Sequence, residues 1–222
     1  MSGLLINQYT YAVPSNPYTK LLMHFDGADG GTVFTDSSQS ARSITRTGTV
    51  TTSNTQSKFG GTSLKNANEG SLVIPNSADF HLGTGDFTIE CWVYLLSYNS
   101  FNTILNASNS GGGAAWRFYA SASGSAANRV SFNNGAYSAS VPPLTTWVHI
   151  AAVRSGGFVK VYLDGVAGTQ AAVATSSAPT GDIIIGKLDT FTSNMYIDEL
   201  RVRVGEAVYT SNFTPPAAPF TS

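Results

Sequence analysis

The sequence has little cysteine and little charge. Cys91 is its single cysteine, so no disulfide can form within the chain. Charged residues make up only 11% of the sequence, against roughly 25% in typical globular proteins. Ser, Thr, Asn and Gly must therefore cover the surface, which is more typical of an extracellular or virion protein than of a cytosolic enzyme.

Basic clusters and long apolar runs are absent as well. The net charge is -1 and no patch of Lys and Arg stands out, so neither nucleic acid nor an anionic membrane is an expected partner. No apolar stretch is long enough to span a bilayer. The N-terminus lacks the basic start and apolar run of a secretory signal peptide, so we expect synthesis in a host cytoplasm without that export route.

Helical periodicity is also missing. No segment repeats apolar residues at helical spacing, whereas residues 87–95 and 158–163 alternate between two faces, as strands do. Asn-Gly at 134–135 and Asp-Gly at 164–165 predict tight hairpin turns, because Gly tolerates positive φ. Many short strands with Gly-rich turns predict an all-β sandwich or barrel, and a chain of this length supports one such domain.

The chain divides into a short arm and one domain. Residues 1–18 contain Pro14 and Pro17, which interrupt strand pairing, and several tyrosines suited to docking contacts. We therefore expect an N-terminal arm there. Residues 19–220 follow a pattern of strand, turn and strand, and the proline-rich segment 213–219 ends it because it cannot continue a strand.

An ordered set of short motifs resembles the laminin-G-like, concanavalin-A-like jelly-roll domains. In chain order the motifs are LLMHFDG (21–27), FTDS (34–37), FGGTSL (59–64), DFTIECWV (86–93), WVHIAAVR (147–154), VYLDG (161–165) and IDELRV (197–202). The closing segment VYTSNFTPP (208–216) looks like the ending of the phage-encoded branch. The resemblance implies an all-β, two-sheet antiparallel jelly-roll sandwich. It also implies a family of sugar-, protein- and particle-binding modules, whose phage members occur in tail, fibre and head-surface proteins.

Catalytic carboxylate pairs are absent from the strands. Glycoside hydrolases on this fold carry two acidic residues at i and i+4 of one strand, which places both on one face. Glu90 stands alone in its strand, and the neighbours Asp198 and Glu199 alternate between faces. The three histidines have no Ser or Cys in a nucleophile context. We therefore predict that the protein is not an enzyme.

One carboxylate in the sequence is a candidate metal ligand. Alternation in residues 196–204 predicts that Asp198 shares the apolar face with Leu200 and Val202, where a carboxylate is costly unless it is paired or metal-bound. The resemblance implies a structural calcium held by Asp26 and Asp198, because many family members hold one with acidic residues at these two places. The carbonyl oxygen of Gly30 is a further expected ligand. The alternative is that Asp198 accepts backbone N–H bonds or pairs with an arginine.

Sugar binding requires exposed aromatic rings beside amides and hydroxyls. The predicted ligand-binding residues are Tyr98, Phe101, Tyr137, Phe191 and Asn194. The three tryptophans, by contrast, are expected in the core, since they lie in strand-like segments.

We predict a non-enzymatic phage virion structural protein, such as a capsid decoration, head fibre or tail component. It is expected at the virion surface, bound to other virion proteins through the arm, as a homo-oligomer that also contacts cell-surface glycans. The alternative is a stand-alone, lectin-like carbohydrate-binding module. A glycan-cleaving enzyme is the lesser alternative.

Overall fold

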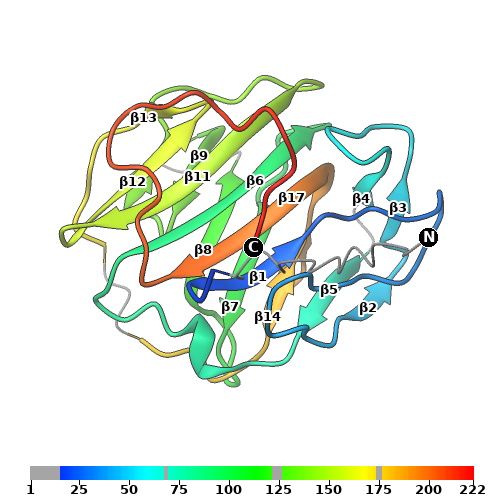
Figure 1. Cartoon of the computed structure of the whole chain (residues 1–222), viewed down its shortest axis with the longest axis horizontal. Coiled ribbons are helices and arrows are strands. Elements are labelled where there is room, and N and C mark those ends of the chain that lie inside the picture. Colours follow the sequence, from blue (N-terminus) through cyan, green and yellow to red (C-terminus); the bar gives the residue numbers. More distant parts are fainter. Residues whose placement is uncertain (1–15, 68–69, 122–126, 174–176) are drawn as a thin grey trace, which may run out of the picture.

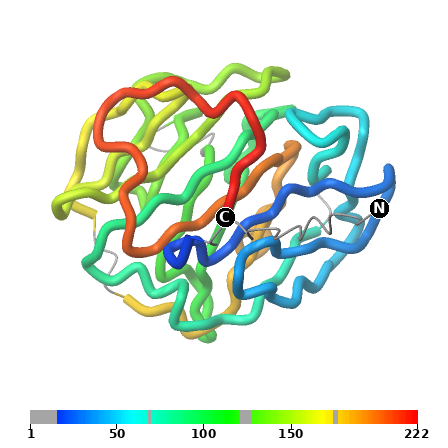
Figure 2. Tube along the Cα trace, in the orientation of Figure 1, coloured from blue at the N-terminus to red at the C-terminus, as the bar shows by residue number. Residues whose placement is uncertain are grey.

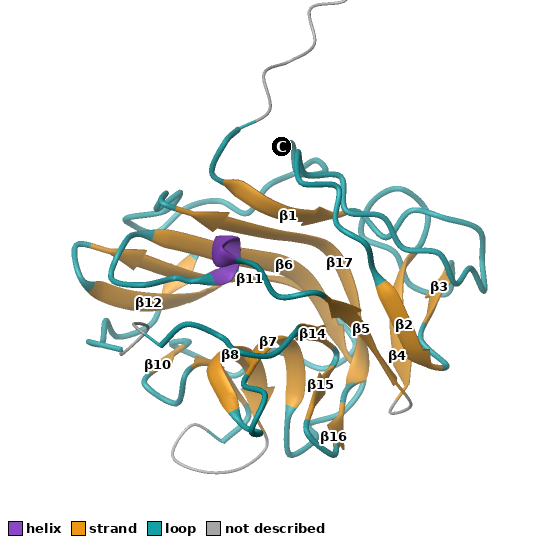
Figure 3. Cartoon of the chain, turned by 90° about the horizontal axis from the view of Figure 1, so that it is seen from below, coloured by secondary structure: helices purple, strands orange, loops and turns teal. Residues whose placement is uncertain are grey.

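Alternation of apolar and polar residues builds two antiparallel sheets that pack face to face (Figure 1). The computed structural model describes residues 16–67, 70–121, 127–173 and 177–222. Most of the predicted arm therefore lies outside the described residues. Seen edge-on, the two sheets form separate layers (Figure 3). The prediction of an all-β jelly-roll sandwich is confirmed.

Eight strands form the first sheet and seven the second. In spatial order the eight-stranded sheet contains β13 (Val166–Ala167), β12 (Phe158–Leu163), β11 (Trp147–Ser155), β6 (Phe87–Leu95), β17 (Asn194–Val204), β4 (Ser63–Ala67) and β3 (Thr51–Ser53), with β1 (Thr19–Met23) paired to β17. The seven-stranded sheet contains β10 (Ala136–Tyr137), β9 (Arg129–Phe132), β8 (Ala114–Ser121), β7 (Asn102–Ser108), β14 (Ile183–Ile185), β5 (Gly70–Ile74) and β2 (Thr45–Gly48). A separate hairpin joins β15 (Lys187–Leu188) to β16 (Phe191–Thr192), and Ala78–Phe80 forms one 3-10 turn.

The core lies between the two sheets. Strand β6 contributes its odd-numbered residues, Phe87 to Leu95, and Trp116 enters from the facing sheet with no exposed surface. Of the other two tryptophans, Trp92 is buried as predicted, whereas Trp147 is not. Trp92 is buried on the outer side of the eight-stranded sheet, in a smaller cluster, and Trp147 is half-buried beside it. No helix among the described residues is long and apolar enough to cross a membrane.

Positive φ values mark the hairpin turns. Asp164 and Gly165 adopt φ values of 47° and 77°, as the Asp-Gly signal predicts. The other turn lies one residue earlier than expected: Asn133 and Asn134 occupy its centre with φ values of 50° and 54°. Asn tolerates this region better than most residues, so the Asn-Asn pair rather than Asn-Gly closes the β9–β10 hairpin.

The segment after β17 covers the outer face of the eight-stranded sheet. Figure 2 shows this red segment crossing the green and yellow strands before it ends near β1. Tyr209 and Phe213 stack at 3.5 Å between ring centroids, and both pack on Tyr162 of β12. Phe220 is only 5% exposed. Residues 206–222, here called the tail, therefore belong to the folded domain instead of merely ending it.

Candidate functional site

The outer face of the seven-stranded sheet carries a line of aromatic rings. Alternate residues of β8 point into the core, so Arg117 and Tyr119 lie on the outer side of the sheet, where other side chains leave Tyr119 only 2% exposed. The rings of Tyr119 and Phe101 lie 5.3 Å apart between centroids, and those of Phe101 and Phe191 lie 5.2 Å apart. The Arg117 guanidinium lies over two of these rings, 5.3 Å from Phe101 and 5.1 Å from Tyr119.

Phe191 presents one end of this line to solvent. It starts β16 in the hairpin after Asp189, whose φ of 50° forms the turn. Its side chain is 44% exposed, which is unusual for a ring already packed against another. A hollow of about 310 Å³ beside it, here called the hairpin hollow, is lined by Asn99, Ser100, Phe101, Thr190, Phe191 and Thr192. Exposed rings next to hydroxyl and amide groups are what sugar sites require.

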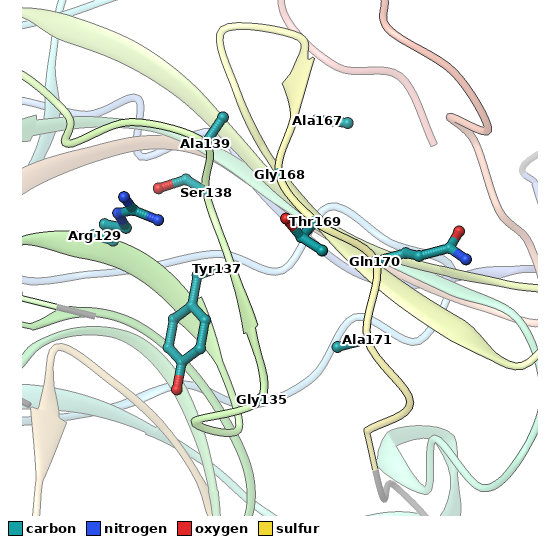
Figure 4. Close-up of a pocket in the computed structure, with 10 residues that line it drawn as sticks. All are labelled: Arg129, Gly135, Tyr137, Ser138, Ala139, Ala167, Gly168, Thr169, Gln170 and Ala171. Atoms are coloured by element: carbon teal, nitrogen blue, oxygen red, sulfur yellow. The ribbon is translucent and has the colours of Figure 1, made fainter. Parts of the chain in front are cut away.

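The other end of the line reaches a pocket at the edge of the sandwich (Figure 4), here called the edge pocket. Its volume is about 520 Å³, and it lies between the β9–β10 hairpin and residues 167–171. Tyr137 and Arg129 line the hairpin side. The hydroxyls of Tyr119 and Tyr137 both donate to Asn134, which connects the pocket to the aromatic line.

Two of the predicted binding residues hold a loop in place. The Tyr98 hydroxyl donates to the carbonyl of Pro142 at 2.8 Å, and its ring packs against the core. The Asn194 amide donates to Ser97 Oγ at 3.0 Å, while its main-chain N–H donates to Asn102 Oδ1 at 2.9 Å. Both residues therefore fix the loop that precedes β7.

Sequence reasoning missed Arg117 and Tyr119 in this site. Residues 114–121 contain Trp and Phe at alternate positions, and that alternation was the available signal that the residues between them face outward. The pairing of Phe101 with Phe191 had no local signal, since 90 positions separate them in the chain.

A second site lies where β17 changes its neighbour. Up to Ile197 the strand pairs with β4, and from Leu200 it pairs with β1. Its register with β6 shifts between Asp198 and Arg201, so Glu199 and Leu200 share one position opposite β6 in a β-bulge. Glu199 has a φ of 53° there.

Because of the bulge, Asp198 lies on the opposite side of the sheet from the one predicted. Leu200 and Val202 do enter the core, but Asp198 pairs opposite Trp92 and faces the other side of the sheet. The prediction that all three share one face was wrong, because it assumed unbroken alternation. Asp198 has no exposed surface nevertheless, since a neighbouring loop covers it.

Asp198 is a buried carboxylate with one oxygen unused. Its Oδ2 accepts main-chain N–H bonds from Lys58 at 2.8 Å and Phe59 at 3.1 Å. Among the described residues, Oδ1 has no hydrogen-bond partner. Burial, with smaller contributions from the charges of Glu199 and Asp26, raises the pKa of Asp198 to about 7, although the two N–H bonds act in the opposite direction.

Asp26 reaches the same loop from its other side. A Cβ on Gly60 would lie 1.6 Å from Asp26 Oδ1, so the carboxylate rests against the backbone next to the N–H groups that hold Asp198. Gly30 lies in the loop after β1, where its N–H donates to the carbonyl of Thr52 at 2.9 Å. Two carboxylates at this loop are hard oxygen donors of the kind that calcium prefers, and one of their oxygens, Asp198 Oδ1, has no hydrogen-bond partner among the described residues. Within the described ranges, no group of three His, Cys, Asp or Glu side chains has metal-binding geometry.

A third group of charges lies beneath the tail. Glu90 has no exposed surface and accepts hydrogen bonds from Arg201 Nε at 3.0 Å and Nη2 at 2.6 Å. His149 Nε2 lies 3.1 Å from the same carboxylate, and the Tyr209 hydroxyl donates to it at 2.8 Å. Arg201 also donates to the carbonyl of Thr221 at 3.0 Å. These partners tie both ends of the tail to the sheet and leave Glu90 closed to a substrate.

Comparison with known proteins supports this architecture. Residues 66–204 match the family described as the concanavalin A-like lectin/glucanases superfamily, of the laminin G type. Domain 4 of AbnA, a GH43 extracellular arabinanase from Geobacillus stearothermophilus solved with arabinotriose, superposes with a TM-score of 0.62 at 16% identity, over 86% of this chain and 94% of that one.

Binding domains of botulinum neurotoxins are similar over about half of their length. The domain of neurotoxin DC, solved with rat synaptotagmin II, has a TM-score of 0.58 and 11% identity over 86% of this chain and 49% of its own. A structure of botulinum neurotoxin type C has a TM-score of 0.59 at 11% identity. The cell entry of that toxin depends on interaction with two ganglioside molecules. At such identities the likeness concerns the fold. No curated protein sequence matches. The family match covers more than half of the sequence, and the chain belongs to the concanavalin A-like lectin and glucanase superfamily.

Proposed function

We propose that this protein is a non-catalytic, lectin-like module that binds glycans on the outer face of its seven-stranded sheet. The observation that carries the proposal is the aromatic line, which ends in the exposed Phe191 at the hairpin hollow and is connected through Asn134 to Tyr137 at the edge pocket. A sugar ring stacks on an exposed aromatic face such as that of Phe191, while Thr190 and Thr192 supply hydroxyls beside it.

Known structures of this fold support the proposal by analogy. The arabinanase domain was solved with a bound arabinose oligomer, and a neurotoxin relative engages gangliosides. Those ligands belong to those proteins, and identities of 16% and 11% transfer no subsite. What transfers is the capacity of this sandwich to hold sugars.

Replacing Phe191 with alanine is expected to weaken glycan binding roughly tenfold, because it removes the exposed stacking surface. Phe158→Ala is the matched control, since Phe158 is 46% exposed on the other sheet. A glycan array identifies the ligand, and calorimetry on the best hit measures the affinities. Equal losses in both variants, or an array without signal for the folded protein, would contradict this proposal.

The absence of catalysis is part of the proposal. Glu90 is fully committed to Arg201, His149 and Tyr209. Asp198 is buried against main-chain N–H groups. No carboxylate pair in the described strands therefore opens onto the aromatic line, which makes the glycan-cleaving alternative the weaker one.

We also propose a structural calcium ion between Asp26 and Asp198. It would neutralise the buried Asp198 carboxylate and join β17 to the end of β1 and to the loop at Gly60. Such an ion stabilises the fork between β1 and β4 and takes no part in a reaction.

We further propose that the module works on the surface of a virion. The phage-like closing segment and the low charge support a particle-surface component that docks through residues 1–18 and assembles as a homo-oligomer. Mass spectrometry of purified virions is expected to detect the protein, and gel filtration is expected to show an oligomer that deletion of residues 1–18 disrupts. A monomer unaffected by that deletion would contradict the docking role of the arm.

A further inference from the structure

The seven-stranded sheet differs from its partner in charge. None of its described strands contains Asp or Glu, whereas β2, β8 and β9 each contribute one arginine: Arg46, Arg117 and Arg129. The acidic residues of the other sheet, Glu90, Asp198 and Glu199, are all buried. The whole stretch from 91 to 163 has no acidic residue. The described strands of this sheet therefore carry only positive charge, while the nearest exposed carboxylates, Asp182 and Asp189, lie in the loops beside β14 and β16.

Two of these arginines face the aromatic line. Arg117 is flanked in β8 by core residues, and Arg129 alternates with the core residue Val130 in β9. Arg129 also lines the edge pocket. Arg46, in contrast, lies on the edge strand β2 and donates to the carbonyl of Val50 at 3.3 Å. Within the described part of the chain, no ion pair involves Arg117 or Arg129.

The guanidinium of Arg117 is held but not neutralised. Stacking over Phe101 and Tyr119 fixes its plane, and a side-chain hydrogen bond to Tyr119 uses part of its five N–H donors. A planar guanidinium pairs with a carboxylate through two parallel hydrogen bonds. Phe101 is also part of the hairpin hollow, so a carboxylate at Arg117 would belong to a sugar stacked beside Phe191.

We infer that this face selects glycans built from uronic acids, with Arg117 as the residue that binds a sugar carboxylate and Arg129 as a second cation at the edge pocket. The inference rests on the proposed glycan-binding function and names its substrate class. Arg117 and Arg129 lie on neighbouring strands, with Asn133 as the pairing neighbour of Arg117. Arg129 pairs with Ser121 of β8, and Ser121 lies four positions beyond Arg117 in that strand, or about 13 Å. A ligand that uses both cations is therefore an oligomer.

The test compares oligogalacturonate with its methyl ester, which keeps the sugar backbone and removes the charge. The wild-type protein is expected to bind the acid at least about tenfold more tightly than the ester at low salt, with the difference shrinking as ionic strength rises. Arg117→Gln is expected to abolish that preference, so that this variant binds the acid and the ester equally. Arg117→Lys, which keeps the charge but not the paired donors, is expected to retain part of it. Arg46→Gln removes the same charge from the far edge and is expected to behave as wild type.

The outcomes separate the two proposals. Equal binding of acid and ester, with both weakened by Phe191→Ala, would overturn the selectivity and leave glycan binding intact. No binding of either ligand or of any arrayed glycan would overturn the glycan-binding function itself. Dextran sulfate that competes as well as oligogalacturonate would show that any polyanion is accepted, and would also overturn carboxylate selection. Melting curves of each variant confirm that the comparison is between folded proteins.

Discussion

Glu90→Ala is expected to lower the free energy of unfolding by about 3–5 kcal/mol, because it leaves a buried arginine without its counter-ion. Arg201 is 6% exposed and directs two N–H groups at the Glu90 carboxylate. His149 and Tyr209 lose their acceptor in the same change. Since Tyr209 belongs to the tail, the tail should detach before the sheets separate. Denaturant unfolding measures the loss, and hydrogen exchange in residues 206–222 reports the detachment.

Glu206→Gln is the matched control for this prediction. Glu206 pairs with Arg203 at 2.9 Å, but its side chain is 33% exposed, so its loss should cost less than about 1 kcal/mol. A loss in Glu90→Ala as small as that of the control, with tail protection unchanged, would show that the buried network does not hold the tail.

Acid should narrow the difference in stability between Glu90→Ala and the wild type. Burial alone would raise the pKa of Glu90, but the bonds and charges of His149 and Arg201 outweigh it and lower that pKa below the ordinary 4.5. A carboxylate with a lowered folded-state pKa stabilises the protein above its unfolded-state value and loses that contribution as the pH falls further. The two proteins should therefore converge in stability only below about pH 4.5.

The fold was predictable because its information is local. Strands β6 and β12 match the segments of alternation at 87–95 and 158–163 residue for residue. Asp164-Gly165 closes its hairpin as expected, because positive φ is a property of those residue types. The alternation of faces is interrupted at Glu199, which adopts a φ of 53° in a β-bulge. A glutamate gives no local sign that a bulge will form there. The cause is tertiary: β17 exchanges β4 for β1 at that point.

The candidate site was only partly predictable for the same reason. Phe101 and Phe191 were identified as exposed loop aromatics, and their contact depends on how a hairpin docks beside β7. Tyr98 is also an aromatic residue in a predicted loop, yet its hydroxyl donates a hydrogen bond to the carbonyl of Pro142. The tail was also only partly predictable. Its prolines correctly indicate that it forms no strand, but they give no information on where the segment packs. Residues such as Tyr209 acquire their role only from a sheet far away in sequence.

Calcium is expected to raise the melting temperature by about 5–10 °C at a concentration near 100 times its dissociation constant, where binding contributes about 2.7 kcal/mol. The reason lies in Asp198, which has no exposed surface and whose Oδ1 has no hydrogen-bond partner among the described residues. EDTA should reverse the gain in the wild type. Asp198→Asn should remove the response to both, because a neutral amide is a far weaker ligand for a hard cation. Thermal unfolding with calcium and with EDTA measures these effects.

The order of stabilities makes this test specific. In EDTA, Asp198→Asn should be at least as stable as the wild type, because it removes a buried charge while its amide oxygen still accepts from Lys58 and Phe59. In calcium the order should reverse. Asp29→Asn removes a charge from the exposed loop after β1, where Asp29 accepts from the Asn54 N–H, and it should keep the full calcium response. A wild type whose melting ignores calcium, or an Asp198→Asn protein that responds like the wild type, would show that Asp198 is buried for another reason. Its two N–H bonds would then be its only partners, as the metal-free alternative requires.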